Sequence, residues 1–252
     1  MCTLVLLRRP DAQWPLVLAA NRDEMIERPW RPPGRHWPDR PEVLAGQDML
    51  AGGSWLGLND HGVIAGILNR FGTLGPAPGQ RSRGELVLEA LDHADARDAA
   101  AALAAIDPRA YRPFNMIIAD NRDGFWLRHA EAGGSVPVTV KALGAGLAMI
   151  AAGDLDETET PRLRRYRPRF AAAAAPDPGS DDWTRWETLL GDGDATLEEG
   201  ATAAMRFRTE RGVATVSSAL IALPAAGRAG AEPVFRFRAW QPQPEPWHDV
   251  PR

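Results

Sequence analysis

The sequence contains a single cysteine, at position 2, and this scarcity excludes several kinds of protein. One thiol cannot form an intramolecular disulfide, so the chain is not a small secreted scaffold stapled by disulfides. The five histidines show no HxxxH spacing, and there is no second cysteine to complete a zinc site. No GxxxxGK[ST] phosphate-binding loop is present. We therefore expect neither a metal ion nor a cofactor.

The chain also lacks an excess of positive charge and a long apolar run. Lysine and arginine number 29 against 33 aspartates and glutamates, and the net charge of -4 gives no reason to expect nucleic acid as a partner. The longest weakly polar stretch, 140–154, is interrupted by glycines and is too short to cross the roughly 30 Å hydrocarbon layer. The start shows no basic segment before an apolar run. We expect a cytoplasmic protein without a membrane span, and the oligomeric state stays open.

What is present is typical of a globular protein of one domain over residues 1–252, with 44% hydrophobic residues. Strand-like patterns dominate, and two helical regions interrupt them, so we expect an α+β fold rather than alternating βαβ units. Hairpins are predicted at 3–20, at 55–69 and around the Asp123-Gly124 turn, further strands at 212–224 and 233–240, helices at 82–107, 160–175 and 183–190, and a long loop at 25–53.

The position of Cys2 suggests a reactive group. Removal of Met1 would leave Cys2 with a free α-amine, whose ordinary pKa is about 7.7–8.0. That amine could take the thiol proton, so that one residue would supply both nucleophile and base. The alternative is a small buried hydrophobe at the start of a strand.

Polar residues follow the second predicted strand abruptly, in the order Asn21, Arg22 and Asp23. In an antiparallel hairpin the end of the second strand lies near the start of the first, so these groups could face Cys2. Arg22 would then favour the thiolate and lower the pKa of the thiol, and Asp23 could orient the α-ammonium or the guanidinium. The alternative is a solvated turn, because the same three residues recur at 121–123 in a predicted hairpin turn.

Five blocks occur in order within the first 120 residues. They are MC at the start, LAANRDE, GGSWLG at 52–57, RGEL at 83–86 and FNMIIAD at 114–120. This pattern resembles the NRDE family, also called the transport and Golgi organisation protein 2 family. The resemblance implies the four-layer αββα sandwich of N-terminal-nucleophile hydrolases and a distant similarity to penicillin and bile-salt acylases. It also implies a connection with haem trafficking and with lipid or acyl-coenzyme A metabolism.

The resemblance further implies roles for individual residues. Cys2 matches the nucleophile of the acylases, and Arg22 and Asp23 fall in the segment that holds their arginine and aspartate. Asn69, in GILNR, matches the asparagine whose amide donates to the oxyanion. Where family members usually read LSN, this chain has AAGD, so that Asp154 would place a carboxylate where an amide is expected.

Three residues are candidates for contact with a substrate: Asn21, Trp55 and Asp154. Trp55 could form an aromatic wall beside the nucleophile, or it could anchor the core at a strand start. The arginine-rich run at 162–170 could attract an anionic substrate, or it could be a solvated helix face.

Two functions follow from these observations. The first is an amidase or acylase that acts on non-peptide C–N bonds through Cys2 after removal of Met1. The second is a non-catalytic carrier or chaperone of haem or of acyl-coenzyme A-type metabolites. The expected ligand is accordingly an acyl amide, an acyl-coenzyme A or haem.

Overall fold

The computed structural model describes residues 2–130, 136–196, 198–228 and 230–252. It divides into two compact units, each with its own sheet and its own helices. The first unit combines Met1–Glu27 with Ala145–Val250, and the second comprises Arg28–Gly144 with Pro251–Arg252. That both units fold as one domain over 1–252 stays a prediction.

The first unit contains a six-stranded antiparallel sheet in the order β10-β1-β2-β11-β12-β13. The predicted hairpin at its start is confirmed, with Thr3 opposite Asn21 and Arg8 opposite Leu16. The long strand β11 then pairs with nearly the whole of β2, and β10 pairs with the free edge of β1. The strands are β1 (Thr3–Arg8), β2 (Leu16–Met25), β10 (Gly146–Ile150), β11 (Val213–Leu223), β12 (Val234–Ala239) and β13 (His248–Asp249).

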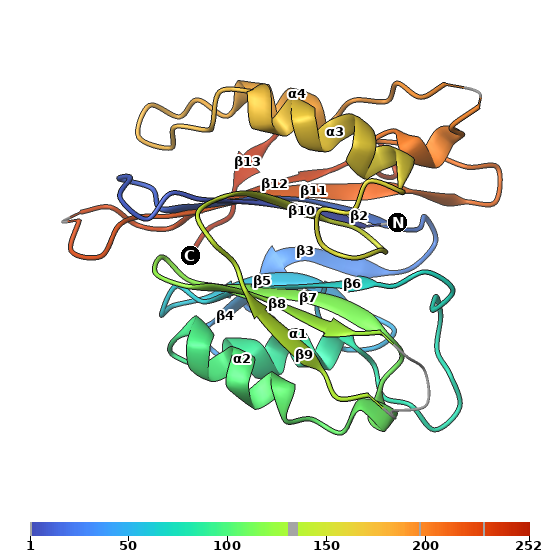
Figure 1. The fold of residues 1–252 in the computed structure, drawn as a ribbon, viewed down its shortest axis with the longest axis horizontal. Coiled ribbons are helices and arrows are strands. Elements are labelled where there is room, and N and C mark those ends of the chain that lie inside the picture. Colours follow the sequence, from blue (N-terminus) through green and yellow to red (C-terminus); the bar gives the residue numbers. More distant parts are fainter. Residues whose placement is uncertain (1, 131–135, 197, 229) are drawn as a thin grey trace. The chain divides into compact units, whose positions relative to one another are not determined.

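Two helices cover one face of this sheet, α3 (Pro161–Ala172) and α4 (Thr184–Leu190), as Figure 1 shows. They confirm the helices predicted at 160–175 and 183–190. A short 3-10 helix, η2 (Ala201–Ala203), follows them. Val17 and Ala19 of β2 pack in the same core cluster as residues of both helices. Because side chains alternate along a strand, the odd-numbered residues of β2 face the helices and the even-numbered residues face away.

The second unit contains a seven-stranded antiparallel sheet in which consecutive strands are neighbours, from β3 to β9. The hairpins predicted around Gly62 and around Asp123-Gly124 are confirmed. The strands are β3 (Trp30–Gly34), β4 (Val43–Asp48), β5 (Leu56–Asn59), β6 (Ile64–Asn69), β7 (Phe114–Ala119), β8 (Gly124–His129) and β9 (Thr139–Ala142).

The loop predicted at 25–53 is wrong, because this segment contains β3 and β4 and the end of β2. Its two consecutive prolines, Pro32 and Pro33, lie in β3, which is an edge strand of the sheet. The register shifts between Arg31 and Gly34, so the prolines fall where the pairing is interrupted. An edge position with interrupted pairing tolerates residues that have no N–H to donate.

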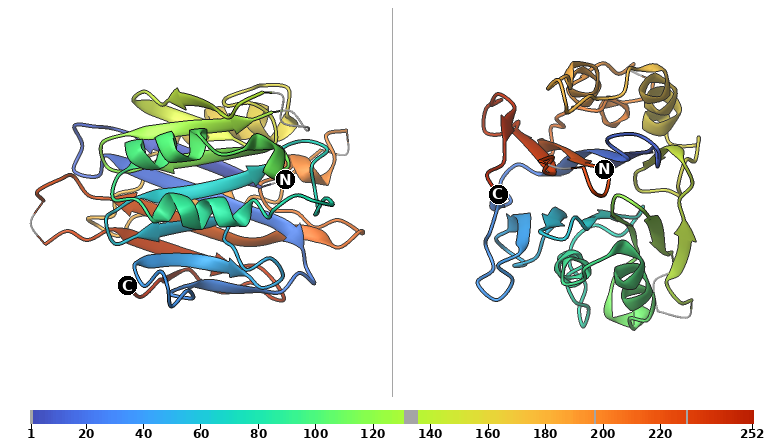
Figure 2. Two further views of the ribbon diagram at one scale, coloured as in Figure 1. Left: turned by 90° about the horizontal axis from the view of Figure 1, so that it is seen from below. Right: turned by 90° about the vertical axis from the view of Figure 1, so that its left-hand side faces the viewer.

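One predicted helix at 82–107 is in fact two, α1 (Gly84–Leu91) and α2 (Ala96–Ala104), followed by the 3-10 helix η1 (Pro108–Ala110). The N-cap of α2 is Asp95, whose side chain accepts from the backbone N–H groups of Arg97 and Asp98. Ser82 is not the N-cap of α1, since Arg83 occupies that position. Figure 2 shows both green helices over one face of the sheet. No helix in the described ranges is long and apolar enough to cross a bilayer.

Candidate nucleophile site

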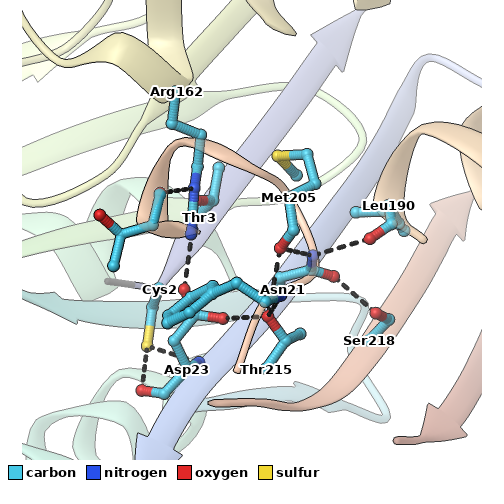
Figure 3. A network of polar contacts seen from close by, with 11 residues as sticks. Cys2, Thr3, Asn21, Asp23, Arg162, Leu190, Met205, Thr215 and Ser218 are labelled. Atoms are coloured by element: carbon cyan, nitrogen blue, oxygen red, sulfur yellow. Dashed lines mark hydrogen bonds and ion pairs between the residues drawn. The ribbon is translucent and has the colours of Figure 1, made fainter. Parts of the chain in front are cut away.

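Cys2 lies directly before β1, at the end of the sheet where β2 also ends. Since Thr3 pairs with Asn21, continuing the register places Cys2 opposite Arg22. The Sγ atom of Cys2 accepts from the backbone N–H of Asp23, 3.4 Å away, and donates to its carbonyl oxygen at 3.5 Å (Figure 3). The structure therefore brings Cys2 to the Asn-Arg-Asp segment, which is the proximity that the hairpin pattern predicts.

The side chains of this segment point alternately to the two faces of the sheet. Asn21 and Asp23 continue the helix-covered face of Val17 and Ala19, and their side chains bond to atoms of the helical layer. Arg22 falls on the opposite face. By the same alternation Thr3 faces the helices and Cys2 faces away from them. The thiol therefore shares a face with Arg22, while the carboxylate of Asp23 lies on the other.

Asp23 forms a buried ion pair with Arg162 of α3. The Nη1 and Oδ2 atoms are 2.7 Å apart, and both side chains are completely inaccessible to solvent. The hydroxyl of Thr215 donates to Oδ1 of Asp23 at 2.8 Å, and Nη1 of Arg162 also donates to Oγ1 of Thr3 at 2.9 Å. The guanidinium lies over the ring of Phe207, 5.2 Å from its centroid. A buried ion pair needs such additional hydrogen bonds to offset its desolvation.

Arg162 is the residue that sequence reasoning missed. The run at 162–170 predicts either an attraction to an anionic substrate or a solvated helix face, whereas Arg162 is fully buried and pairs with Asp23. It lies on the buried side of α3 with Tyr166 and Phe170, whereas the side chain of Arg164 is 54% exposed. The spacing of four residues from Arg162 to Tyr166 and again to Phe170 is the available signal, because it places the arginine in the apolar stripe of the helix.

Asn21 is fully occupied in a second buried network on the helix-covered face. Its amide nitrogen donates to the carbonyl oxygens of Leu190 and Met205 at 3.0 and 2.9 Å. Ser218 donates to its Oδ1 at 2.5 Å and in turn accepts from the indole N–H of Trp240 at 2.7 Å. These bonds tie the end of β2 to the layer above it. A role for Asn21 in binding substrate stays a prediction.

The thiol of Cys2 is held in its protonated form. Burial raises the pKa of the Cys2 thiol above its ordinary value, and the negative charge of Asp23 raises it further. The hydrogen bond from the Asp23 N–H and the charge of Arg22 lower this pKa without cancelling the rise. The prediction of a thiol pKa lowered by Arg22 is therefore wrong in its net direction, although the effect of Arg22 itself has the expected sign. At neutral pH the thiol needs a base before it can attack.

Asp154 lies in the turn after β10, the strand that pairs with β1. Leu4 lies opposite Ile150, so the chain leaves β10 at the sheet end that holds Cys2. The turn is anchored by Asp156, whose Oδ1 accepts from the N–H of Met149 and from the Nε of Arg167, each at 2.8 Å. A role for Asp154 opposite an oxyanion stays a prediction.

Asn69 and Trp55 belong to the second unit. Asn69 is the last residue of β6, where it pairs with Phe114. Trp55 precedes β5 and meets Trp30 edge to face, with ring centroids 5.9 Å apart. A Cβ atom on Gly46 would lie 2.3 Å from the ring of Trp55, so this indole lies directly against the backbone of β4. The contact supports the reading of Trp55 as a packing anchor. The roles of Asn69 and Trp55 in a reaction stay predictions.

Two of the sequence blocks have a structural explanation. A Cβ atom on Gly53 would lie 2.4 Å from the carbonyl carbon of Gly84, and the N–H of Ser54 donates to the Gly84 oxygen at 2.9 Å. GGSWLG and RGEL therefore meet where the backbone at the start of α1 touches the segment before β5. Among the described residues, no group of three or more His, Cys, Asp or Glu side chains could hold a metal ion.

Solved structures share the fold. An N-acylethanolamine-hydrolyzing acid amidase ortholog from Caenorhabditis elegans has a TM-score of 0.61 at 12% identity, over 90% of this chain and 95% of that one. A mutant conjugated bile acid hydrolase from Clostridium perfringens has a TM-score of 0.52 at 12% identity, over 99% and 92%. Penicillin V acylase from Agrobacterium tumefaciens has 0.52 at 12%, over 99% and 86%. The expected α+β fold of N-terminal-nucleophile hydrolases is confirmed.

Curated proteins are similar over a shorter stretch. A Transport and Golgi organization protein 2 homolog from Bos taurus is 38% identical over 112 residues, which cover 42% of this chain and 38% of the bovine one. The Mus musculus homolog is 43% identical over 75 residues, or 29% of this chain and 26% of its own length. The matched part is thus well under half of each relative. The family model described as Transport and Golgi organisation 2 matches residues 1–191, and the chain belongs to this NRDE-type family.

Proposed function

We propose that the protein is a cysteine amidohydrolase that cleaves a non-peptide C–N bond through Cys2 after removal of Met1. One observation carries this proposal: the sulfur of a partly exposed cysteine at a strand end is held by the main chain of Asp23, on the sheet face of Arg22. The named activities of the structural neighbours support it, since they are an acid amidase, a conjugated bile acid hydrolase and a penicillin acylase. The bile acid hydrolase structure is moreover that of a mutant whose second residue, a cysteine, is replaced by alanine.

The raised pKa of the thiol determines how the reaction begins. The α-amine of a processed Cys2, with an ordinary pKa of about 7.7–8.0, takes the thiol proton as Sγ attacks the carbonyl carbon of the amide. The C–N bond then breaks, and the proton passes to the departing nitrogen. An acyl thioester remains on Cys2. Water attacks this thioester, releases a carboxylic acid and restores the thiol.

Two further residues act on the oxyanion in this proposal. The side-chain amide of Asn69 donates to it, a role worth about 2.7–4 kcal/mol of barrier where one such donor has been removed from an enzyme. The carboxylate of Asp154 opposes the same charge, so activity is weak and Asp154→Asn raises it. No change in turnover in Asp154→Asn would contradict this placement of Asp154 and leave the role of Cys2 intact.

The test uses the purified chain and intact-mass measurement. Loss of Met1 is expected in the protein as made in cells. Incubation with N-acyl amino acids and acyl-lactams is expected to add one acyl group, and because Cys2 is the single thiol of the sequence a thioester can form only there. Cys2→Ser should lose most turnover. Asn69→Ala should slow acylation about 100- to 1000-fold, and the control Asn121→Ala, in a hairpin turn, should not.

A carrier of haem or of an acyl-coenzyme A-type metabolite would give a different pattern. Haem, followed by its absorbance, or a non-hydrolysable acyl-coenzyme A would bind Cys2→Ser nearly as well as the unmodified chain, and no acyl adduct would form with any amide. That combination of results would replace the amidohydrolase proposal by the carrier. Full retention of Met1 would also remove the proposed base.

A further inference from the structure

Two features of the first unit meet at Asp23. The main chain of Asp23 holds the Cys2 sulfur through its N–H and its carbonyl group. The side chain of Asp23 forms the fully buried ion pair with Arg162, which comes from a helix 139 residues further along the chain. The residue that touches the thiol is therefore the residue that anchors the strand end to α3.

Arg162 fixes both strands that flank the thiol. One nitrogen atom, Nη1, donates to Asp23 Oδ2 at 2.7 Å and to Thr3 Oγ1 at 2.9 Å. Thr3 is bonded directly to Cys2 in the chain, and the peptide of Asp23 contacts the sulfur. The Nε atom of Arg162 donates to the carbonyl oxygen of Thr202 at 3.1 Å, and this bond fixes the orientation of the guanidinium. Arg162 thus contacts both the residue next to Cys2 in the chain and the residue that hydrogen-bonds its sulfur.

We propose that Arg162 is the positioning residue of the Cys2 thiol, a buried cation that holds Cys2 against the Asp23 peptide and neutralises the Asp23 carboxylate behind it. Arg162 acts through Asp23 and Thr3, and it lies on the helix-covered face of the sheet, away from the face of the thiol. The idea rests on the proposed reactivity of Cys2, and it is tested by the chemistry of the thiol with no amide present.

The charges around the thiol determine the direction in which each variant should shift the thiol pKa. Asp23 and Arg22 come from β2 and Arg162 comes from α3, while the β11 residue at this end, Thr215, is uncharged. A carboxylate near the sulfur disfavours the thiolate, and a guanidinium bound to that carboxylate reduces the effect. Removal of the cation and removal of the anion should therefore move the thiol pKa in opposite directions, although both break the same ion pair.

The experiment measures the rate of Cys2 alkylation by iodoacetamide against pH, with intact mass as the readout and the state of Met1 recorded in the same spectrum. Below the thiol pKa, a shift of one pKa unit changes this rate about tenfold. We expect Arg162→Met to react about 3- to 10-fold more slowly than the unmodified chain at fixed pH, and Asp23→Asn to react faster by a similar factor. Arg162→Lys keeps the charge, and its alkylation rate should be close to that of the unmodified chain.

Arg164→Met is the matched control, because Arg164 lies on the same helix with an exposed side chain and should leave the profile unchanged. A role limited to stability would loosen the strand end in both ion-pair variants and shift both profiles in the same direction. That result, or an Arg162→Met profile equal to that of Arg164→Met, would overturn the proposal.

Loss of the buried cation can also prevent folding, so a milder variant completes the test. Thr215→Val removes one hydrogen-bond donor from the Asp23 carboxylate and leaves every charge in place. It should slow alkylation, whereas Asp23→Asn should speed it. A change of the alkylation rate in the same direction in these two variants would overturn the proposal, even if Arg162→Met does not fold. If the expected shifts appear while no amide is ever cleaved, the positioning role stands and the amidohydrolase proposal fails.

Discussion

The tripeptide Asn-Arg-Asp occurs twice in this chain, at 21–23 and at 121–123, in two entirely different settings. The first copy lies in β2 with all three residues buried. The second copy forms the turn between β7 and β8, where Asp123 pairs with Arg97 at 3.0 Å and Arg122 is largely exposed. Identical residues thus form a buried network in one unit and a solvated turn in the other. The strand context decides between them, and the three letters alone do not.

Some buried polar side chains of the second unit differ in role from the Asp23–Arg162 pair of the first. Two of them complete local backbone structure: Asn59 donates to the carbonyl oxygens of Leu91 and His93 at the end of α1, and Asp120 accepts from the N–H of Ala96 at the start of α2. In the first unit Asp23 and Arg162 bond side chain to side chain across the layers. The Asp23–Arg162 pair therefore joins the end of β2 to α3 beside Cys2.

The largest difference between the copies should appear in stability. Asp23→Ala leaves the guanidinium of Arg162 buried without its anion, and we expect a loss of about 3–5 kcal/mol in the free energy of unfolding. Asp123→Ala breaks an exposed pair and should cost about 1 kcal/mol or less. Urea denaturation of the two variants measures both values. Equal losses would mean that the Asp23–Arg162 pair contributes no more than a surface ion pair.

A smaller difference is expected for the asparagines. Asn21→Ala removes both donors to the buried carbonyl oxygens of Leu190 and Met205, at a cost of about 2–3 kcal/mol. Asn121→Ala lies in the hairpin turn and should change the free energy of unfolding by about 0.5 kcal/mol or less. The same urea titration compares them, and a tolerated Asn21→Ala would show that water replaces the lost donors.

The arginines should differ in reactivity. Arg22 favours the thiolate of Cys2, so Arg22→Gln should raise the pKa of the thiol further and slow iodoacetamide alkylation by a few-fold at about pH 8. Arg122→Gln should have no effect on this rate. Faster alkylation in Arg22→Gln would show that the arginine acts by covering the sulfur rather than by its charge.

The pH dependence of stability sharpens the contrast between the units. His129 of β8 is buried in the second unit, where it bonds to the carbonyl oxygen of Tyr111, and burial lowers the pKa of its imidazole. A lowered pKa means that the unfolded chain takes up a proton first as the pH falls. The stability linked to His129 is therefore complete above about pH 6.5 and declines below it. His129→Gln should reduce the change in the urea midpoint between pH 7 and pH 5. His248→Gln, at an exposed position, should leave that change as it is.

The sequence predicts much of the fold because its signals are local. Turn residues and alternating apolar residues indicate the hairpins of β1–β2, β5–β6 and β7–β8, and an apolar stripe indicates α3. The prolines of β3 conceal a strand, since an edge position tolerates a residue that no propensity favours. The break between α1 and α2 was missed because alanines and leucines continue a helical pattern through Asp95.

The site is less predictable, because its contacts join distant segments. The hairpin brings Cys2 to Asp23 by local pairing, and this proximity follows from the sequence. The partner of Asp23 does not, because Arg162 reaches it from a helix whose packing depends on the whole first unit. The predicted direction of the shift in the thiol pKa is wrong for a related reason. The charge of Arg22 can be read from the sequence, whereas the burial that outweighs it cannot.

The strand order β10-β1-β2-β11 has a consequence for folding during synthesis. Strands β1 and β2 occupy the interior of their sheet, and β11, which pairs with β2, begins at Val213, roughly 190 residues after β2 ends. At a translation rate of roughly 5–20 residues per second, this separation corresponds to about 10–40 s. For that interval the nascent hairpin carries Cys2 without β11, which later completes the sheet, so the thiol is more accessible to enzymes and chaperones than in the folded protein.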